Sequence, residues 1–237
     1  MIDQKYRHEL KYVCTEAQLR LIQNRIHHLM KYDEHVGDNH TYQIRSVYFD
    51  YLDDRCYYEN ENGTDPREKF RIRMYNANTK NLHLELKRKE NGKTLKQSCS
   101  LTLEQCERIL HNQPVPITKE NPAVLNKFLL QRQAAGLRPK VIVEYDREPF
   151  VYKNGNVRVT FDRNIRSSNA IQDFLKERLN TRLILPSGQH VLEVKYDEFL
   201  PDFIYNNVQI PNLRQTAFSK YYLCRKYTVG GNINDIF

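Results

Sequence analysis

The sequence predicts an α+β protein in which antiparallel strands curl into a closed β-barrel tunnel with a charged lumen, and in which amphipathic helices pack on the outside. Three observations predict this: strict alternation of apolar and charged residues, tight turns between alternating segments, and helical repeats of apolar residues. The apolar strand faces give the helices a surface to pack on, so the charged faces point away from them. Closure would remove exposed strand edges and bring the charged faces together.

The N-terminal half alternates between strand and helix signals. Arg7, Glu9 and Lys11 share one face of a predicted strand over residues 5–13, opposite tyrosine and leucine side chains. Thr15 then suits an N-cap, and apolar residues at helical spacing predict a helix over 16–30. The same criteria predict, in order, a strand over 43–50, a short helix and a loop within 51–67, strands over 70–75, 82–89 and 93–98, the last two joined by the turn Asn91-Gly92, and a helix from Thr102 to Leu110.

The C-terminal half repeats this pattern with longer strands. Val124, Leu125, Phe128 and Leu129 form an apolar stripe that predicts a helix over 122–134. The remaining predictions are strands over 141–151 and 157–163 joined by a turn at Asn154-Gly155, a helix over 170–183, a break at Pro186-Ser187-Gly188, a strand over 191–196 and a last helix over 217–227.

Length and charge narrow the class of protein further. The 237 residues are interpreted as one domain, 1–237, because no repeat or linker divides them. A formal net charge of +8, spread along the chain, predicts a polyanionic partner: nucleic acid, an acidic membrane surface or a phosphate-rich small ligand. The five cysteines suggest neither a disulfide framework nor a zinc site. With no signal peptide and no apolar run of the ~20 residues that a membrane span needs, we expect a cytoplasmic protein.

Arginines set among apolar residues mark the charged strand faces. Arg71 and Arg73 stand about 7 Å apart on one side of their strand, a spacing that suits a ligand with repeated negative charge. Taken alone, such a pair is usually the solvated face of a sheet; here the same device recurs at Arg147 and Arg158. Arginine holds phosphate oxygens bidentately, which favours a phosphate-rich ligand.

Glutamates interrupt the same charged faces, at Glu9, Glu85, Glu144 and Glu193. Carboxylates would repel a phosphate chain unless they pair with the bases or hold a divalent cation that bridges to it. For Glu85 and Glu144 both alternatives stay open, the first being a salt bridge that orients the nearby Lys87 or Arg147. Mg²⁺ or Mn²⁺ is commonly held by one or two carboxylates plus phosphate oxygens, so the acids predict a divalent metal, Mn or Mg.

The charged segments form an ordered series: Arg7-x-Glu9-x-Lys11-Tyr12, Val47-Tyr48-Phe49-Asp50, Arg71-x-Arg73-x-Tyr75, Glu85-x-Lys87, Arg147, Arg158, Glu193-x-Lys195 and Ser219-Lys220. This series resembles that of the vacuolar transporter chaperone (VTC) catalytic domain, the polyphosphate-polymerase branch of the triphosphate tunnel metalloenzymes. The resemblance runs from about Tyr6 to Lys226 and rests on the order and number of the motifs. It implies a tunnel that binds triphosphate or polyphosphate together with a divalent metal.

The resemblance also implies roles for individual residues. Glu193 would bind the metal, and Lys93 is the alternative to Lys96 as a base of the lumen. Arg7 stands where hydrolytic members of the superfamily carry the first acid of Glu-x-Glu-x-Lys, which favours polymer handling over hydrolysis. The implied phosphate ligands are Lys11, Arg71, Arg73, Lys87, Lys96, Arg147, Arg158, Ser219 and Lys220. All of these except Lys96 and Ser219 are also the implied catalytic residues.

The implied reaction is transfer of the terminal phosphoryl group of ATP to a growing inorganic polyphosphate, with release of ADP. Such transfer depends mainly on positioning and charge stabilisation, which a basic lining and one metal supply. The alternatives are a triphosphatase of the same fold and a non-catalytic polyphosphate-binding module. Nucleic acid is not expected as a partner, because acids interrupt the cationic rows. A membrane-protein partner that receives the product would place the chain at the inner face of a membrane.

Overall fold

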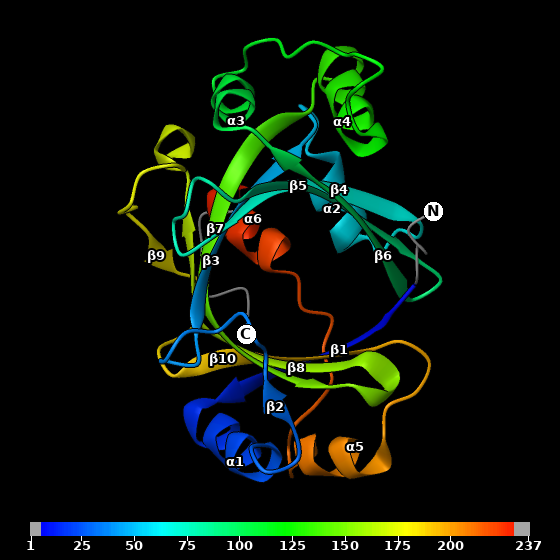
Figure 1. The fold of residues 1–237 in the computed structure, drawn as a ribbon, viewed down its shortest axis with the longest axis vertical. Coiled ribbons are helices and arrows are strands. Elements are labelled where there is room, and N and C mark those ends of the chain that lie inside the picture. The colour runs from blue at the N-terminus through cyan, green and yellow to red at the C-terminus, as the bar shows by residue number, and fades with distance from the viewer. Residues whose placement is uncertain (1–5, 230–237) are drawn as a thin grey trace.

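The fold is a single antiparallel sheet that curls around an interior (Figure 1). It is seen in a computed structural model that describes residues 6–229. Within these residues the sheet has ten strands in the spatial order β1-β10-β8-β7-β3-β4-β5-β6, with β2 added to β7 and β9 added to β8. The strands are β1 (His8–Thr15), β2 (Lys31–Tyr32), β3 (Tyr42–Asp50), β4 (Arg67–Tyr75), β5 (Leu82–Glu90), β6 (Lys93–Leu101), β7 (Arg138–Tyr152), β8 (Val157–Ser168), β9 (Arg182–Leu183) and β10 (Gln189–Tyr196).

Among the described residues, the two ends of this order, β1 and β6, meet at the bridge between Arg7 and Thr94. Arg7, just before β1, and Thr94 on β6 exchange two backbone hydrogen bonds, each 3.0 Å from nitrogen to oxygen. Beside the bridge, the Tyr6 hydroxyl donates to the Glu90 carboxylate at 2.8 Å. The predicted α+β class is confirmed, and within residues 6–229 the two edges of the curled sheet are joined by this bridge rather than by a continuous ladder. Lys5, the predicted start of the first strand, and the two ends of the predicted domain lie outside the described residues.

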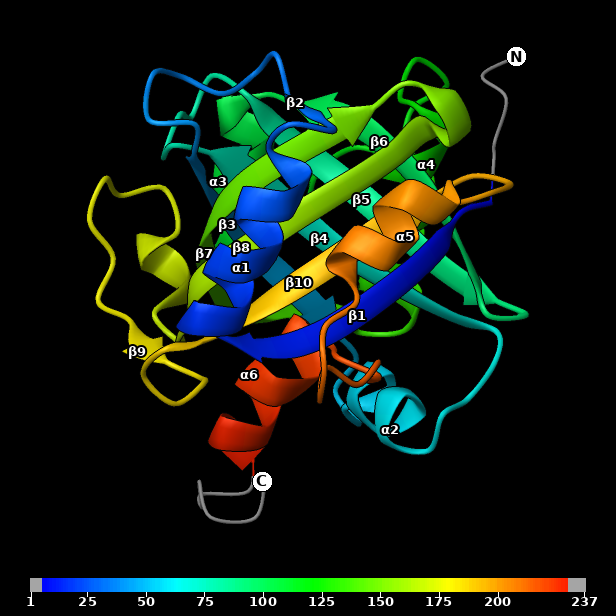
Figure 2. The ribbon, with the colours of Figure 1, turned by 90° about the horizontal axis from the view of Figure 1, so that it is seen from below.

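Helices cover the outer face of the sheet on two sides. Figure 1 shows α3 and α4 over the side that carries β5 and β6, and Figure 2 shows α1 and α5 across β8, β10 and β1. Thr15 and Thr102 are the N-caps of α1 and α3, as predicted, and each forms a capping box with the glutamine three positions later. The helices are α1 (Glu16–Ile26), α2 (Arg55–Glu61), α3 (Leu103–Leu110), α4 (Ala123–Ala134), α5 (Asp202–Val208) and α6 (Lys220–Val229), with short 3₁₀ turns η1 (Asn154–Asn156) and η2 (Ile171–Asp173).

Alternate residues of the strands bury their apolar side chains beneath these helices. Under α3 and α4, the core includes Phe70, Ile72, Leu84, Leu86, Ile109 and Phe128. Under α1 and α5, it includes Leu19, Ile22, Phe161, Leu192, Val194 and Ile204. Because side chains alternate across a strand, the charged neighbours of these residues point into the curl.

One helix, α6, packs on the inner face of the sheet. Tyr221 and Cys224 of this helix lie with Ile44, Val141 and Val143, whose side chains point into the curl. This contact fills part of the interior with apolar side chains. It also brings the first residue of α6, Lys220, into the interior beside the charged strand residues.

The prediction of a helix over 170–183 is wrong. The fully buried guanidinium of Arg45 donates to three carbonyl oxygens of this segment, those of Phe174, Lys176 and Glu177, at 2.9, 2.5 and 3.0 Å. Three carbonyls that converge on one guanidinium do not all point along a common axis, as the carbonyls of a continuous helix do. The segment therefore forms only η2 and the short strand β9. Helix α5 follows Pro201 and was not predicted, and none of the described helices is long and apolar enough to cross a membrane.

Candidate functional site

The inner face of the sheet lines a cavity of ≈ 790 Å³. Nine of the ten predicted site residues contribute to its wall: Lys11, Arg71, Arg73, Lys87, Lys96, Arg147, Glu193, Ser219 and Lys220. They come from six strands and the start of α6, and alternation along each strand is what turns them inward.

Arg158, the tenth predicted site residue, does not line the cavity. It lies on β8, and its guanidinium donates to Asp33, in the segment after β2. Lys93, the alternative to Lys96, is exposed at the first position of β6 and is likewise not part of the wall. The wall thus contains Lys96 rather than Lys93.

Glu85, a buried residue of β5, holds three of the cavity cations. Its carboxylate accepts from Arg71 Nε at 2.6 Å and lies 2.5 Å from Lys96 Nζ and 3.8 Å from Arg73 Nη1. Burial raises the pKa of Glu85, but Arg71, Arg73 and Lys96 outweigh it and hold the pKa well below its usual range. Of the two alternatives for Glu85, ion pairing is the one seen, with these partners rather than Lys87.

Asp162, fully buried on β8, fixes a second pair of cations. Arg147 donates to its two oxygens at 2.6 and 2.7 Å, and Lys220 Nζ lies 2.6 Å from Oδ2. Burial raises the pKa of Asp162, yet Arg147 and then Lys220 lower it below its ordinary value. A bidentate pair of this kind sets the plane of the guanidinium as well as its position. Arg147 from β7 and Lys220 from α6 are therefore held side by side.

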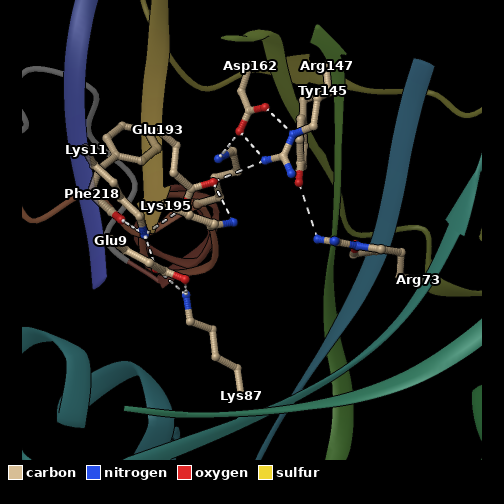
Figure 3. A network of polar contacts seen from close by, with 12 residues as sticks. Glu9, Lys11, Arg73, Lys87, Tyr145, Arg147, Asp162, Glu193, Lys195 and Phe218 are labelled. Atoms are coloured by element: carbon tan, nitrogen blue, oxygen red, sulfur yellow. Dashed lines mark hydrogen bonds and ion pairs between the residues drawn. The ribbon is translucent and has the colours of Figure 1, made fainter. Parts of the chain in front are cut away.

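Lys11 lies between two glutamates, as Figure 3 shows. Its ammonium is 3.6 Å from Glu193 Oε1 and 3.7 Å from Glu9 Oε2, and it donates to the Phe218 carbonyl at 3.0 Å. Each glutamate has a further lysine partner. Lys195 Nζ lies 3.0 Å from Glu193 and Lys87 Nζ lies 2.7 Å from Glu9.

These neighbours set the protonation states around Lys11. Burial raises the pKa of Glu193, but Lys195 and Lys11 hold it well below its usual range. The same balance, between burial and Lys87, lowers the pKa of Glu9 to about 2. Burial in turn lowers the pKa of Lys87 to about 8, against the opposing effect of Glu9. Both carboxylates are thus ionised at neutral pH.

The two glutamates are the candidate metal ligands of the cavity. Among the residues that the structure describes, no group of three or more His, Cys, Asp or Glu side chains could hold a metal ion. Mg²⁺ and Mn²⁺, however, are commonly bound by one or two carboxylates, with the substrate phosphates completing the shell. Glu9 and Glu193 approach the same ammonium, that of Lys11, so they fit a metal that arrives with phosphate oxygens.

Two tyrosine hydroxyls orient the arginines of β4. Arg71 donates to the Tyr48 hydroxyl at 2.8 Å, and Arg73 donates to the Tyr145 hydroxyl at 3.3 Å. Although burial raises the pKa of Tyr48, the adjacent Arg71 and Arg73 lower it below its ordinary value. The arginine side chains are thereby fixed before any ligand arrives.

The sequence analysis placed Glu144 on the charged strand face of Arg147, and the structure corrects this placement. The two residues are three positions apart, and positions an odd number apart on a strand point to opposite faces. Glu144 pairs instead with the buried Arg45, at 2.6 Å, beneath the segment that follows β8. Arg7 also lies outside the wall, since its guanidinium pairs with Asp197 at 3.0 Å.

Four basic residues of the wall were missed as candidate ligands: Arg67, Lys69, Lys89 and Lys195. Each continues a row already recognised, since Lys69 stands two positions before Arg71 and Lys195 two positions after Glu193. The period of two was the signal that could have found them. With these four, the described wall holds eleven lysines and arginines and three glutamates, Glu9, Glu61 and Glu193.

By its fold and its cavity, the protein belongs to the α+β class, with one curled antiparallel sheet around a basic cavity. Two solved structures share the fold. A protein of Bacillus halodurans, provisionally described as an adenylate cyclase, has a TM-score of 0.51 and 13% identity over 87% of each chain. HpAC1 from Hippeastrum, an adenylyl cyclase candidate described as revealing a dominant triphosphatase activity, has a TM-score of 0.53 and 12% identity over 94% of this chain and 95% of its own.

The chain belongs to the VTC domain family, whose model matches residues 6–229. The resemblance seen in the motif series is therefore confirmed over the whole range from which it was inferred. No match was found among the curated proteins.

Proposed function

We propose that this protein is a metal-dependent polyphosphate polymerase, which transfers the γ-phosphoryl group of ATP to the end of an inorganic polyphosphate chain in the basic cavity. The observation that carries the proposal is the composition of the wall, with eleven cations against three glutamates. Membership of the VTC domain family supports it, because the motif series resembles the polymerase branch.

The chemistry asks little of the protein beyond placement of charge. In phosphoryl transfer, catalysis is mostly positioning and stabilisation of the charge on the transferred group. Glu85 and Asp162 hold Arg71 and Arg147 in place, so these arginines need little reorganisation to receive phosphate oxygens. The acceptor is an ionised phosphate and needs no general base. A divalent metal held by Glu193, with Glu9, would supply further charge neutralisation between phosphate oxygens.

A triphosphatase is the second candidate function. The structural likeness to HpAC1, for which a dominant triphosphatase activity is described, favours it. Arg7 was the sequence feature against hydrolysis, and it pairs with Asp197 outside the cavity wall. Its positive charge therefore does not act directly on a ligand in the cavity.

The test is product analysis with ATP and either Mn²⁺ or Mg²⁺, resolving polyphosphate on gels while ADP and free phosphate are assayed in parallel. Long chains with matching ADP are the expected result. Free phosphate in the same amount as ADP, without chains, would identify a triphosphatase. If neither polyphosphate nor free phosphate forms, a non-catalytic binding module is the function that remains. Lys80→Ala, at an exposed lysine outside the cavity, is the control for each cavity variant.

The setting of the reaction is part of the same proposal. ATP and inorganic polyphosphate are the proposed partners, in the cytoplasm, with a membrane protein as the recipient of the product. A membrane protein that co-purifies with the intact chain, and that is absent from a parallel purification without the chain, would support this placement. A chain that makes polyphosphate alone and binds no membrane fraction would contradict it.

A further inference from the structure

Three cations of the cavity wall differ from the other eight. Arg67 and Lys69 on β4 and Lys89 on β5, here called the outer trio, have no carboxylate within 4.0 Å among the described residues. Arg67 donates to the Thr64 carbonyl at 2.9 Å and Lys69 to Asn60 Oδ1 at 3.0 Å, both neutral partners. Each of the other eight cations lies within ion-pair distance of a protein carboxylate.

The register of the sheet places the outer trio against other cations. Arg67 is directly opposite Lys89, and Lys69 is directly opposite Lys87. Side chains directly opposite on antiparallel strands approach closely, and like charges there destabilise the pair. At Arg67 and Lys89 no carboxylate within ion-pair distance offsets this repulsion among the described residues. At Lys69 and Lys87 it is offset on one side only, because Glu9 pairs with Lys87.

Acidic side chains act on the outer trio only from beyond ion-pair distance. Asp50 favours the charged form of Lys69 and Asp65 that of Lys89, but burial outweighs both and lowers the pKa of each lysine. For Lys69 the pKa falls to about 7, with Arg67 adding to the effect of burial. A bound anion would favour the charged lysines and relieve the repulsion between the strands.

The outer trio also lengthens the basic row. Arg67, Lys69, Arg71 and Arg73 occupy alternate positions of β4, so they share one face over roughly 20 Å at about 3.4 Å per residue. That length exceeds a triphosphate group, and α2 and the residues after it, including Asn60 and Gly63, line the cavity beside this end of the row. A ligand that fills the row must be a chain of repeated anions.

We propose that the outer trio is a second anion-binding subsite, which takes phosphates of a polyphosphate chain whose end is held by the carboxylate-paired cations. The protein then binds long inorganic polyphosphate in preference to triphosphate. This inference rests on the proposed function for the identity of the ligand, but it concerns equilibrium binding and requires no turnover. The gain in binding free energy per phosphate is largest at the outer trio, because no protein carboxylate has to be displaced there.

The experiment is isothermal titration calorimetry with tripolyphosphate and with long-chain polyphosphate, without ATP. The variant is K69Q/K89Q, and the matched control is K80Q/K119Q, which removes two exposed charges outside the cavity. We expect the variant to lose about tenfold in affinity for the long chain, equivalent to about 1.4 kcal/mol, and to keep its tripolyphosphate affinity within about twofold. The control should keep both affinities.

An equal loss for the two ligands in K69Q/K89Q, or no loss for either, would overturn the inference. So would a wild-type protein with equal affinity for both ligands, whatever its catalytic activity. If the trio sets the preference for long chains while ATP yields only free phosphate, the inference stands and the proposed polymerase fails. Retained tripolyphosphate binding in the variant also shows that it is folded.

Discussion

Replacing Asp162 by asparagine tests whether buried carboxylates hold the cavity cations in place. Asp162 is fully buried and neutralises both Arg147 and Lys220, through contacts of 2.6 to 2.7 Å. Removing one partner of a buried ion pair costs about 3–5 kcal/mol, and we take about 3 kcal/mol because asparagine keeps one acceptor oxygen. In a domain of this size, 1 kcal/mol shifts the Tm by roughly 2–4 °C, so the expected fall is roughly 6–12 °C.

The assay is thermal unfolding of Asp162→Asn with and without tripolyphosphate. The substitution leaves Lys220 without its carboxylate partner and leaves Arg147 with Glu193 alone, at 3.2 Å. These two cations should gain more from phosphate than they do in the wild type, so the ligand should raise the Tm of the variant by more. Asp146→Asn is the matched control, since Asp146 is partly exposed and lies 3.2 Å from Arg166, and it should cost less than about 1 kcal/mol. A variant that melts within about 2 °C of the wild type, or equal ligand shifts in both proteins, would refute the reasoning.

Three further predictions follow from the wall of the cavity. Arg73→Ala should abolish turnover yet leave the Tm within a few degrees, because Glu85 keeps Arg71 and Lys96; loss of folding would count against its placement in the lumen. Glu193→Gln should raise the Mn²⁺ concentration for half-maximal activity at least about tenfold. Glu61→Gln should not, because the Glu61 carboxylate accepts a hydrogen bond from the Tyr222 hydroxyl, at 3.2 Å, and is not a candidate metal ligand. Glu9 has a pKa lowered from 4.5 to about 2, so its contribution to stability is present above pH 4.5 and is lost as the pH falls through about 2. The free energy of unfolding should therefore fall less steeply with acid in Glu9→Gln than in the wild type. An unchanged profile would contradict the pairing of Glu9 with Lys87.

The strands and most of the cavity wall could be predicted because alternation is a local signal. It put Arg71 and Arg73 on one face, and the same parity argument, applied strictly, excludes Glu144 from the face of Arg147. The partner of each charge could not be predicted in this way. Whether Glu85 holds Lys87 or Arg71 depends on the register between β4 and β5, and Arg158 is bound by Asp33 from a segment 125 positions away.

The helix predicted over 170–183 failed for a related reason. Its local sequence favours a helix, but three of its carbonyl groups converge on Arg45, a residue of β3 that sequence reading did not select. Tertiary hydrogen bonds overrode the local preference. Such a contact is visible only once the outer face of the sheet has been assembled.

Among the residues that the structure describes, β1 and β6 are joined by the bridge between Arg7 and Thr94, and this has a topological consequence. A continuous ring admits a polymer only by its end, whereas a curled sheet joined at Arg7 and Thr94 can admit one sideways when that junction opens. Opening removes two backbone hydrogen bonds, each contributing about 1 kcal/mol net, together with the side-chain contacts beside them. We therefore expect the Arg7 and Thr94 amides to exchange with solvent faster than those of the β7–β8 ladder, and a polymer without free ends, such as a cyclic polyphosphate, to reach the cavity.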